Sequence, residues 1–169
     1  VRQETLHAII RDWCDSFFRH GFRHVLIYSG HGGNAGPLAA IIADLVAMDG
    51  RRSIIGCTDW ALYDGTLFPR AEAHGIGKFE AGWHAGELET SMILALDPGL
   101  VRMDRARPGF IGDLDAFRDV LMRDGVQAVA PSGVLGDPTL GDRERGADYL
   151  AALTASITRF FRDAIDRRA

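Results

Sequence analysis

Two patterns of apolar residues alternate along the first third of the chain. Apolar side chains recur at helical spacing in residues 6–18 and again in residues 38–46. Two further segments, residues 23–29 with the apolar run 25–28 and residues 53–57, read as strands that are buried on both faces. Helix, strand, helix and strand in this order predict an α/β fold with a mainly parallel sheet, covered by helices on both faces in three α/β/α layers.

The rest of the chain is predicted to be helical with long connections. Residues 58–83, in which Pro69 and small residues are mixed with charges, predict a long loop. Helices are expected at 87–96, 114–122 and 142–165, and the last of these carries a long apolar stripe. The charged side chains of the predicted loop are expected to be solvated: Asp59, Asp64, Glu72, His74 and Glu80.

Composition narrows the class of protein. The 169 residues are 47% hydrophobic and carry a formal net charge of −4, which suits one folded domain without a nucleic-acid surface. No apolar stretch is long enough to span a bilayer.

The two cysteines, Cys14 and Cys57, do not form a C-x-x-C pair, as expected of a reduced cytoplasmic protein. Cys57 follows a strand and could be a nucleophile, but we interpret it as a core residue because no neighbour in the sequence lowers its pKa.

A histidine in a glycine-rich segment directly follows the first predicted strand. Residues 29–34 read Ser-Gly-His-Gly-Gly-Asn. Ligands bind at the carboxyl ends of strands in open α/β sheets, so His31 is a candidate metal ligand or base, with Gly32, Gly33 and Asn34 against a substrate. The alternatives are a histidine that caps its own turn and a phosphate cradle, although the spacing of neither common phosphate motif is present.

A second candidate segment begins at His84. If a helix starts there, Glu87 lies three residues on and shares a face with His84, which is one way to present two metal ligands. Glu89 points away from that face. The alternative is that Glu87 and Glu89 are first-turn acids that interact favourably with the helix dipole.

Two tryptophans flank this region. Trp60 and Trp83 lie in or beside the predicted long loop. Aromatic side chains in loops form walls of pockets for planar ligands, and they also form small satellite cores. Both interpretations stay open.

Three segments together resemble the creatininase (creatinine amidohydrolase) family. They are residues 20–34, residues 84–91 and the turn-rich residues 133–139 ahead of the last helix. The resemblance implies a three-layer α/β/α fold and a metal-dependent hydrolase of small amides with two divalent ions, commonly zinc, manganese or iron. It implies that His31 is a metal ligand and that His84 is a catalytic proton shuttle at the substrate. Trp60 matches a pocket tryptophan loosely.

The chain departs from the family pattern in two places. Creatininases proper have a Tyr-Glu pair where this chain has Gly32 and Gly33, and we expect Glu87 to replace the missing carboxylate, with Glu89 supporting the ligands. The family's upstream Glu-x-His and later Asp are not found in residues 1–169. We therefore expect one creatininase-like domain over 1–169 that lacks an N-terminal part and holds a fraction of the metal site.

The expected function is hydrolysis of the C–N bond of a small cyclic amide or formamide by metal-activated water. His84 would give a proton to the leaving nitrogen. The alternatives are a non-catalytic α/β domain that binds an anion or nucleotide, and a catalytically silent fragment of the family. The expected partners are a small-molecule amide and further copies of the chain, with neither nucleic acid nor membrane.

Overall fold

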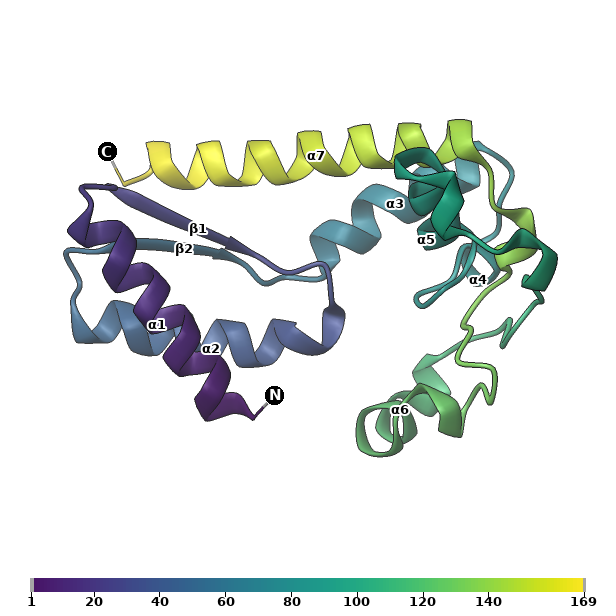
Figure 1. Cartoon of the computed structure of the whole chain (residues 1–169), viewed down its shortest axis with the longest axis horizontal. Coiled ribbons are helices and arrows are strands. Elements are labelled where there is room, and N and C mark those ends of the chain that lie inside the picture. Colours follow the sequence, from purple (N-terminus) through teal and green to yellow (C-terminus); the bar gives the residue numbers. More distant parts are fainter. Residues whose placement is uncertain (1, 169) are drawn as a thin grey trace. The chain divides into compact units, whose positions relative to one another are not determined.

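The computed structural model describes residues 2–168, with side chains for residues 2–117, 119–121 and 123–168. The helices and strands are α1 (Gln3–Arg19), β1 (His24–Tyr28), α2 (Ala35–Met48), β2 (Ser53–Cys57), α3 (Ala61–Ala73), α4 (Lys78–Ala81), α5 (Glu87–Leu96), α6 (Arg118–Asp124) and α7 (Arg143–Asp166) (Figure 1). They form two compact units, each described by itself: unit 1, residues 2–62 and 156–168, and unit 2, residues 63–155.

Unit 1 is built on a parallel pair of strands. β1 and β2 pair in register from His24 with Ser53 to Tyr28 with Cys57. One face of the sheet packs on α1 and α2, and Ile54 is buried there. The other face packs on the C-terminal part of α7, where Ile55 and Cys57 are buried. The α/β class, the parallel pairing and the three layers are therefore confirmed within unit 1.

The alternation of side chains along β2 explains why helices cover both faces of the sheet. Successive residues of a strand point to opposite faces, so the unbroken apolar run of β2 supplies side chains to both cores. Burial raises the pKa of the Cys57 thiol, and the Asp59 carboxylate raises it further. Cys57 is buried and is not a disulfide partner, in agreement with its interpretation as a core residue.

Unit 2 consists of helices and turns among its described residues. Its buried side chains lie on one face of α3, on α5, on α7 and at Ala81, Ala130 and Leu135. The helices α5 and α7 approach closely at Gly146, where an added Cβ would overlap the backbone oxygen of Ser91. Glycine is required at this position because any side chain would push the two helices apart.

The predicted loop over residues 58–83 is wrong. Residues 61–73 form α3 and residues 78–81 form α4. Tyr63, Leu67 and Ala71 recur every fourth residue and bury one face of α3, and the helix continues through Pro69. Within residues 2–168, no helix is long and apolar enough to cross a membrane.

Candidate functional site

The His31 loop in unit 1 is ordered by its own polar groups. The amide N–H of His31 donates to Ser29 Oγ at 3.2 Å, and Asn34 Nδ2 donates to the same oxygen at 3.2 Å. The amide N–H of Asn34 donates to the His31 carbonyl at 3.0 Å. The imidazole itself belongs to an exposed residue, so it is available to a ligand.

The glycines of this loop make room for rings. A Cβ on Gly33 would lie 2.7 Å from Nε2 of His31, so only glycine leaves the imidazole where it is. A Cβ on Gly32 would lie 3.4 Å from the indole of Trp60. Because β1 and β2 are parallel, their carboxyl ends deliver His31 and Trp60 to the same edge of the sheet. The structure thus brings together four of the predicted site residues: His31, Gly32, Gly33 and Trp60.

The His84 loop in unit 2 is clamped against residues 134–136. His84 and Leu135 form an antiparallel bridge, in which the Leu135 amide donates to the His84 carbonyl at 2.8 Å. The Trp83 amide donates to the Leu135 carbonyl at 3.1 Å. The second and third segments that resemble the creatininases are therefore neighbours in space, and they hold the exposed His84 in place through the backbone.

Three glycines permit this close backbone approach. A Cβ on Gly82 would overlap the Leu135 carbonyl oxygen, and one on Gly86 would lie 3.0 Å from the same atom. A Cβ on Gly136 would lie 2.9 Å from the Cα atoms of both Gly82 and Gly86. Contacts of this length are sterically forbidden for other residues, which explains the glycine-rich sequence of both segments.

Ala85 is strained between these glycines. Its φ of 51° places it in the left-handed region, which residues with a Cβ rarely adopt. The Ala85 amide donates to Glu89 Oε2 at 2.5 Å, which supports this conformation from the first turn of α5. Strained non-glycine residues cluster at ligand sites, so the observation points to the His84 loop as a functional segment.

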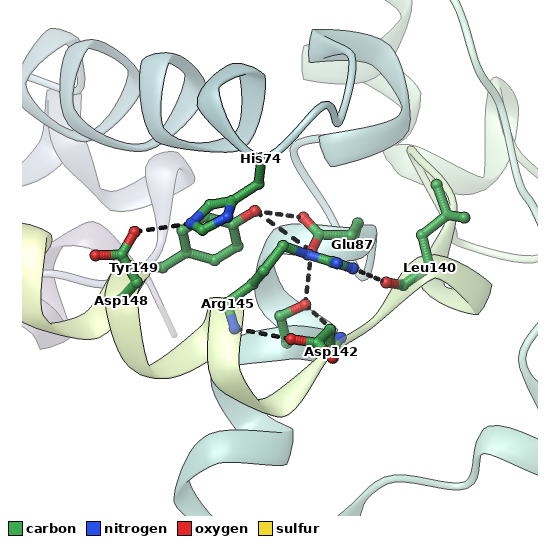
Figure 2. Close-up of polar contacts among 8 residues, drawn as sticks. His74, Glu87, Leu140, Asp142, Arg145, Asp148 and Tyr149 are labelled. Carbon is green, nitrogen blue, oxygen red and sulfur yellow. Dashed lines mark hydrogen bonds and ion pairs between the residues drawn. The ribbon is translucent and has the colours of Figure 1, made fainter.

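Glu87 occupies a different environment from the one that the sequence predicts. It has no exposed surface, and its Oε1 accepts hydrogen bonds from Arg145 Nε at 2.9 Å and from Ser91 Oγ at 2.7 Å (Figure 2). Tyr149 donates its phenol O–H to Oε2 at 3.2 Å. An ion pair with a guanidinium occupies the carboxylate, and this geometry gives the predicted metal ligation by Glu87 no support.

The buried carboxylate also organises its surroundings. Burial raises the pKa of the Tyr149 phenol, and the Glu87 carboxylate raises it further, so Tyr149 is a neutral hydrogen-bond donor. Ser91 Oγ in turn accepts a hydrogen bond from the Asp142 amide at 2.9 Å. The network joins the start of α5 to the start of α7 and fixes the helix that follows the His84 loop (Figure 2).

The sequence alone does not single out the residues that surround Glu87 and Trp83. Arg145 and Tyr149 lie on the long last helix, where Tyr149 reads as part of the apolar stripe. Two of the predicted solvated charges are instead engaged. His74 Nε2 bonds with Asp148 Oδ2 at 2.9 Å, and Asp64 has a buried carboxylate oxygen. The position of Asp64 on α3 would have been readable from the four-residue spacing of the apolar face of that helix.

The described residues do not complete a metal site. Across residues 2–168, three or more His, Cys, Asp or Glu side chains are nowhere grouped so as to hold an ion. His31 belongs to unit 1, whereas His84, Glu87 and Glu89 belong to unit 2. A catalytic metal site needs three protein ligands, so neither unit supplies a full set from its own residues.

Comparison with known proteins identifies the family. The model of the creatininase family, creatinine amidohydrolase, matches residues 1–161. This chain therefore belongs to the creatininase family. The mycofactocin precursor peptide peptidase of Mycobacterium tuberculosis (strain ATCC 25618 / H37Rv) is 31% identical over 147 residues, which cover 81% of this chain and 47% of that protein. The chain thus spans about half the length of the curated relatives it matches.

Solved structures show the same fold. A Bacteroides fragilis NCTC 9343 protein described as a creatinine amidohydrolase superposes with a TM-score of 0.73 at 25% identity, covering 97% of this chain and 62% of the other. A manganese form of creatininase superposes with a TM-score of 0.72 at 22% identity, covering 96% of this chain and 65% of the other. The three segments singled out in the sequence lie within the matched part of the chain.

Proposed function

We propose that this chain is part of a hydrolase that cleaves an amide C–N bond. The observation that carries the proposal is the His84 loop, in which an exposed imidazole is held by a backbone bridge beside a strained residue. Membership in the creatininase family gives the chemical class. The relative in Mycobacterium tuberculosis is named as a peptidase of a precursor peptide, which favours a peptide amide over a small cyclic amide as substrate.

His84 has the role of proton donor in this proposal. An amide nitrogen is a poor leaving group until it is protonated, and a positioned histidine contributes a factor of about 10²–10⁴ to such a step. The bridge to Leu135 fixes the main chain of His84, while the side chain stays exposed to a substrate. Gly82, Gly86 and Gly136 keep the loop in place without covering the imidazole.

A divalent metal belongs to the proposal through the family. A solved neighbour is described as a manganese form of creatininase. His31 is the residue of unit 1 that we assign to the metal, since its imidazole is exposed at the carboxyl end of β1. Because the described residues do not complete a ligand set, the activation of water is not assigned to any of them.

The test is hydrolysis of a substrate panel that contains short peptides, a formamide and creatinine, followed by mass spectrometry. His84→Gln keeps a polar side chain without a transferable proton, and it should lower turnover of an accepted substrate at least 100-fold. His20→Gln is the matched control, because His20 is exposed and its imidazole bonds with the Ser16 carbonyl of the preceding helix. Equal turnover in His84→Gln and His20→Gln would contradict the role of His84.

The same panel separates the proposal from its alternative. A non-catalytic domain that binds an anion through the His31 loop would leave every amide intact and would bind inorganic phosphate. Turnover that depends on His84 excludes that alternative for this chain. Phosphate binding without turnover would favour it instead.

A further inference from the structure

Side chains of two helices of unit 2, α3 and α4, meet at the indole of Trp83. Asp64 on α3 accepts a hydrogen bond from the indole N–H. Phe68, one turn further along α3, contacts the indole edge to face, with ring centroids 4.9 Å apart and planes at 63°. Lys78 of α4 places its ammonium 5.0 Å from the centroid of the indole and 5.7 Å from that of Phe68. The ring is therefore fixed by a hydrogen bond, an aromatic contact and a cation–π contact.

The carboxyl group of Asp64 is destabilising where it lies. Its Oδ1 is buried and has no hydrogen-bond partner among the described residues. Burial raises the pKa of Asp64, and the Trp83 hydrogen bond and the Lys78 charge oppose that rise. An unpartnered buried oxygen is a cost that an apolar side chain of the same shape would avoid. The presence of a carboxylate at this buried position therefore needs an explanation other than stability.

The orientation of Trp83 supplies that explanation. The main chain of Trp83 is held by its bond to the Leu135 carbonyl at 3.1 Å, but this bond leaves the ring free to rotate about the side-chain torsions. The hydrogen bond to Asp64 selects one orientation because the indole has a single donor. Trp83 directly precedes His84, so the segment that carries the exposed imidazole also carries this fixed ring.

We propose that Asp64 is a positioning residue that holds the indole of Trp83 as a wall of the ligand site next to His84. The inference rests on the proposed function in one respect, namely that a substrate is bound beside His84. Asp64 acts on binding through Trp83 and takes no part in proton transfer. Its removal should therefore change KM and leave kcat largely intact.

The placement of the ring is tested by NMR of the indole N–H groups in the ¹⁵N-labelled chain, with Trp83→Phe to assign the signal. Asp64→Leu should shift the Trp83 signal and speed its exchange with solvent about tenfold, as expected for one lost hydrogen bond. Asp64→Asn keeps an acceptor oxygen and should retain the signal near its original position. Glu72→Gln, at an exposed position on the same helix, is the control. If the Trp83 signal stayed in place in Asp64→Leu, the proposal that Asp64 orients the indole would be wrong.

The consequence for binding is tested by kinetics with an accepted substrate. Asp64→Leu should raise KM about tenfold with kcat within twofold of the original value, and Asp64→Asn should restore KM. A shifted indole signal with an unchanged KM would overturn the role at the ligand site. If the unaltered chain turns over no amide at all, the proposed function fails, and the indole signal still decides whether Asp64 places Trp83.

Discussion

Glu87 and Arg145 form an ion pair across 58 positions of sequence, with Arg145 Nε 2.9 Å from Glu87 Oε1. The side chain of Glu87 is fully buried, and that of Arg145 is 23% exposed. The pair links the first turn of α5 to the first turn of α7. A buried carboxylate tolerates its environment only while its cation and its hydrogen-bond donors are in place.

Removal of the cation should be strongly destabilising. Arg145→Met leaves the Glu87 carboxylate buried with only hydroxyl donors, and it should lower the free energy of unfolding by about 3 kcal/mol in urea titrations at pH 7. Arg70→Met is the control, because Arg70 pairs with Asp148 at 3.5 Å and its side chain is 52% exposed. That variant should lose less than about 1 kcal/mol. If both variants lost the same free energy of unfolding, the buried ion pair would stabilise the chain no more than the exposed pair does.

The close approach of α5 and α7 gives a second prediction. A Cβ on Gly146 would overlap the Ser91 carbonyl oxygen, so Gly146→Ala should force the helices apart and destabilise unit 2 by about 3 kcal/mol. Gly65→Ala is the matched control in α3, since no atom lies within 4 Å of its added Cβ. Gly65→Ala should stabilise the chain by about 0.5–1 kcal/mol through helix propensity. Thermal and urea unfolding of both variants check the opposite signs.

Much of unit 1 could be predicted from sequence, because apolar runs and helical spacing predict strands and amphipathic helices. The runs at residues 23–29 and 53–57 became β1 and β2, and the three layers followed from their order. The predicted burial of β1 on both faces is wrong, because Leu26 and Tyr28 are 44% and 37% exposed. In α3 the apolar spacing was present, but Pro69 and the charges around it suggested a loop. Proline restricts a helix without always ending it, so tertiary packing on Tyr63, Leu67 and Ala71 decided the outcome.

The candidate site was predicted in part for a related reason. The positions of His31 and Trp60 follow from strand ends, whereas His84 lies ahead of α5 in an extended bridge and does not share a helical face with Glu87 as expected. The environment of Glu87 depends on Arg145 and Tyr149, which are 58 and 62 residues away along the chain. Helical spacing places Glu87 on a face, but it does not show what covers that face. A buried carboxylate and a metal-binding carboxylate have the same local sequence.

The buried oxygen of Asp64 predicts a specific dependence of stability on pH. Burial raises the pKa of Asp64, so the folded chain binds this proton more tightly than the unfolded chain does. The contribution of Asp64 to stability is therefore unfavourable at pH 7 and improves as the pH falls through its raised pKa. Asp64→Asn should be more stable than the unaltered chain at pH 7, and the difference should shrink toward pH 4. Urea titrations at both pH values check this, with Glu72→Gln showing no such trend.

The buried carboxylate of α5 should not respond to metal. The Glu87 carboxylate is occupied by Arg145. Glu87→Gln should therefore leave Mn²⁺ binding within about twofold, and His31→Ala should weaken it about tenfold or more. Electron paramagnetic resonance of free Mn²⁺ at millimolar concentration measures both. A loss confined to Glu87→Gln would instead support the ligand role that the sequence predicts.

Residues 1–169 should bind divalent metal only weakly, so amide hydrolysis by this chain should require Mn²⁺ or Zn²⁺ in excess. Catalytic metal sites keep three protein ligands in place, and the described residues bring no such group together in either unit. Water would then fill most of the coordination positions around an ion at His31, and dialysis would remove the ion. Elemental analysis of the dialysed chain should find far less than one zinc or manganese per molecule, and His31→Ala should lower weak binding further. Tight, stoichiometric metal together with turnover would contradict this expectation.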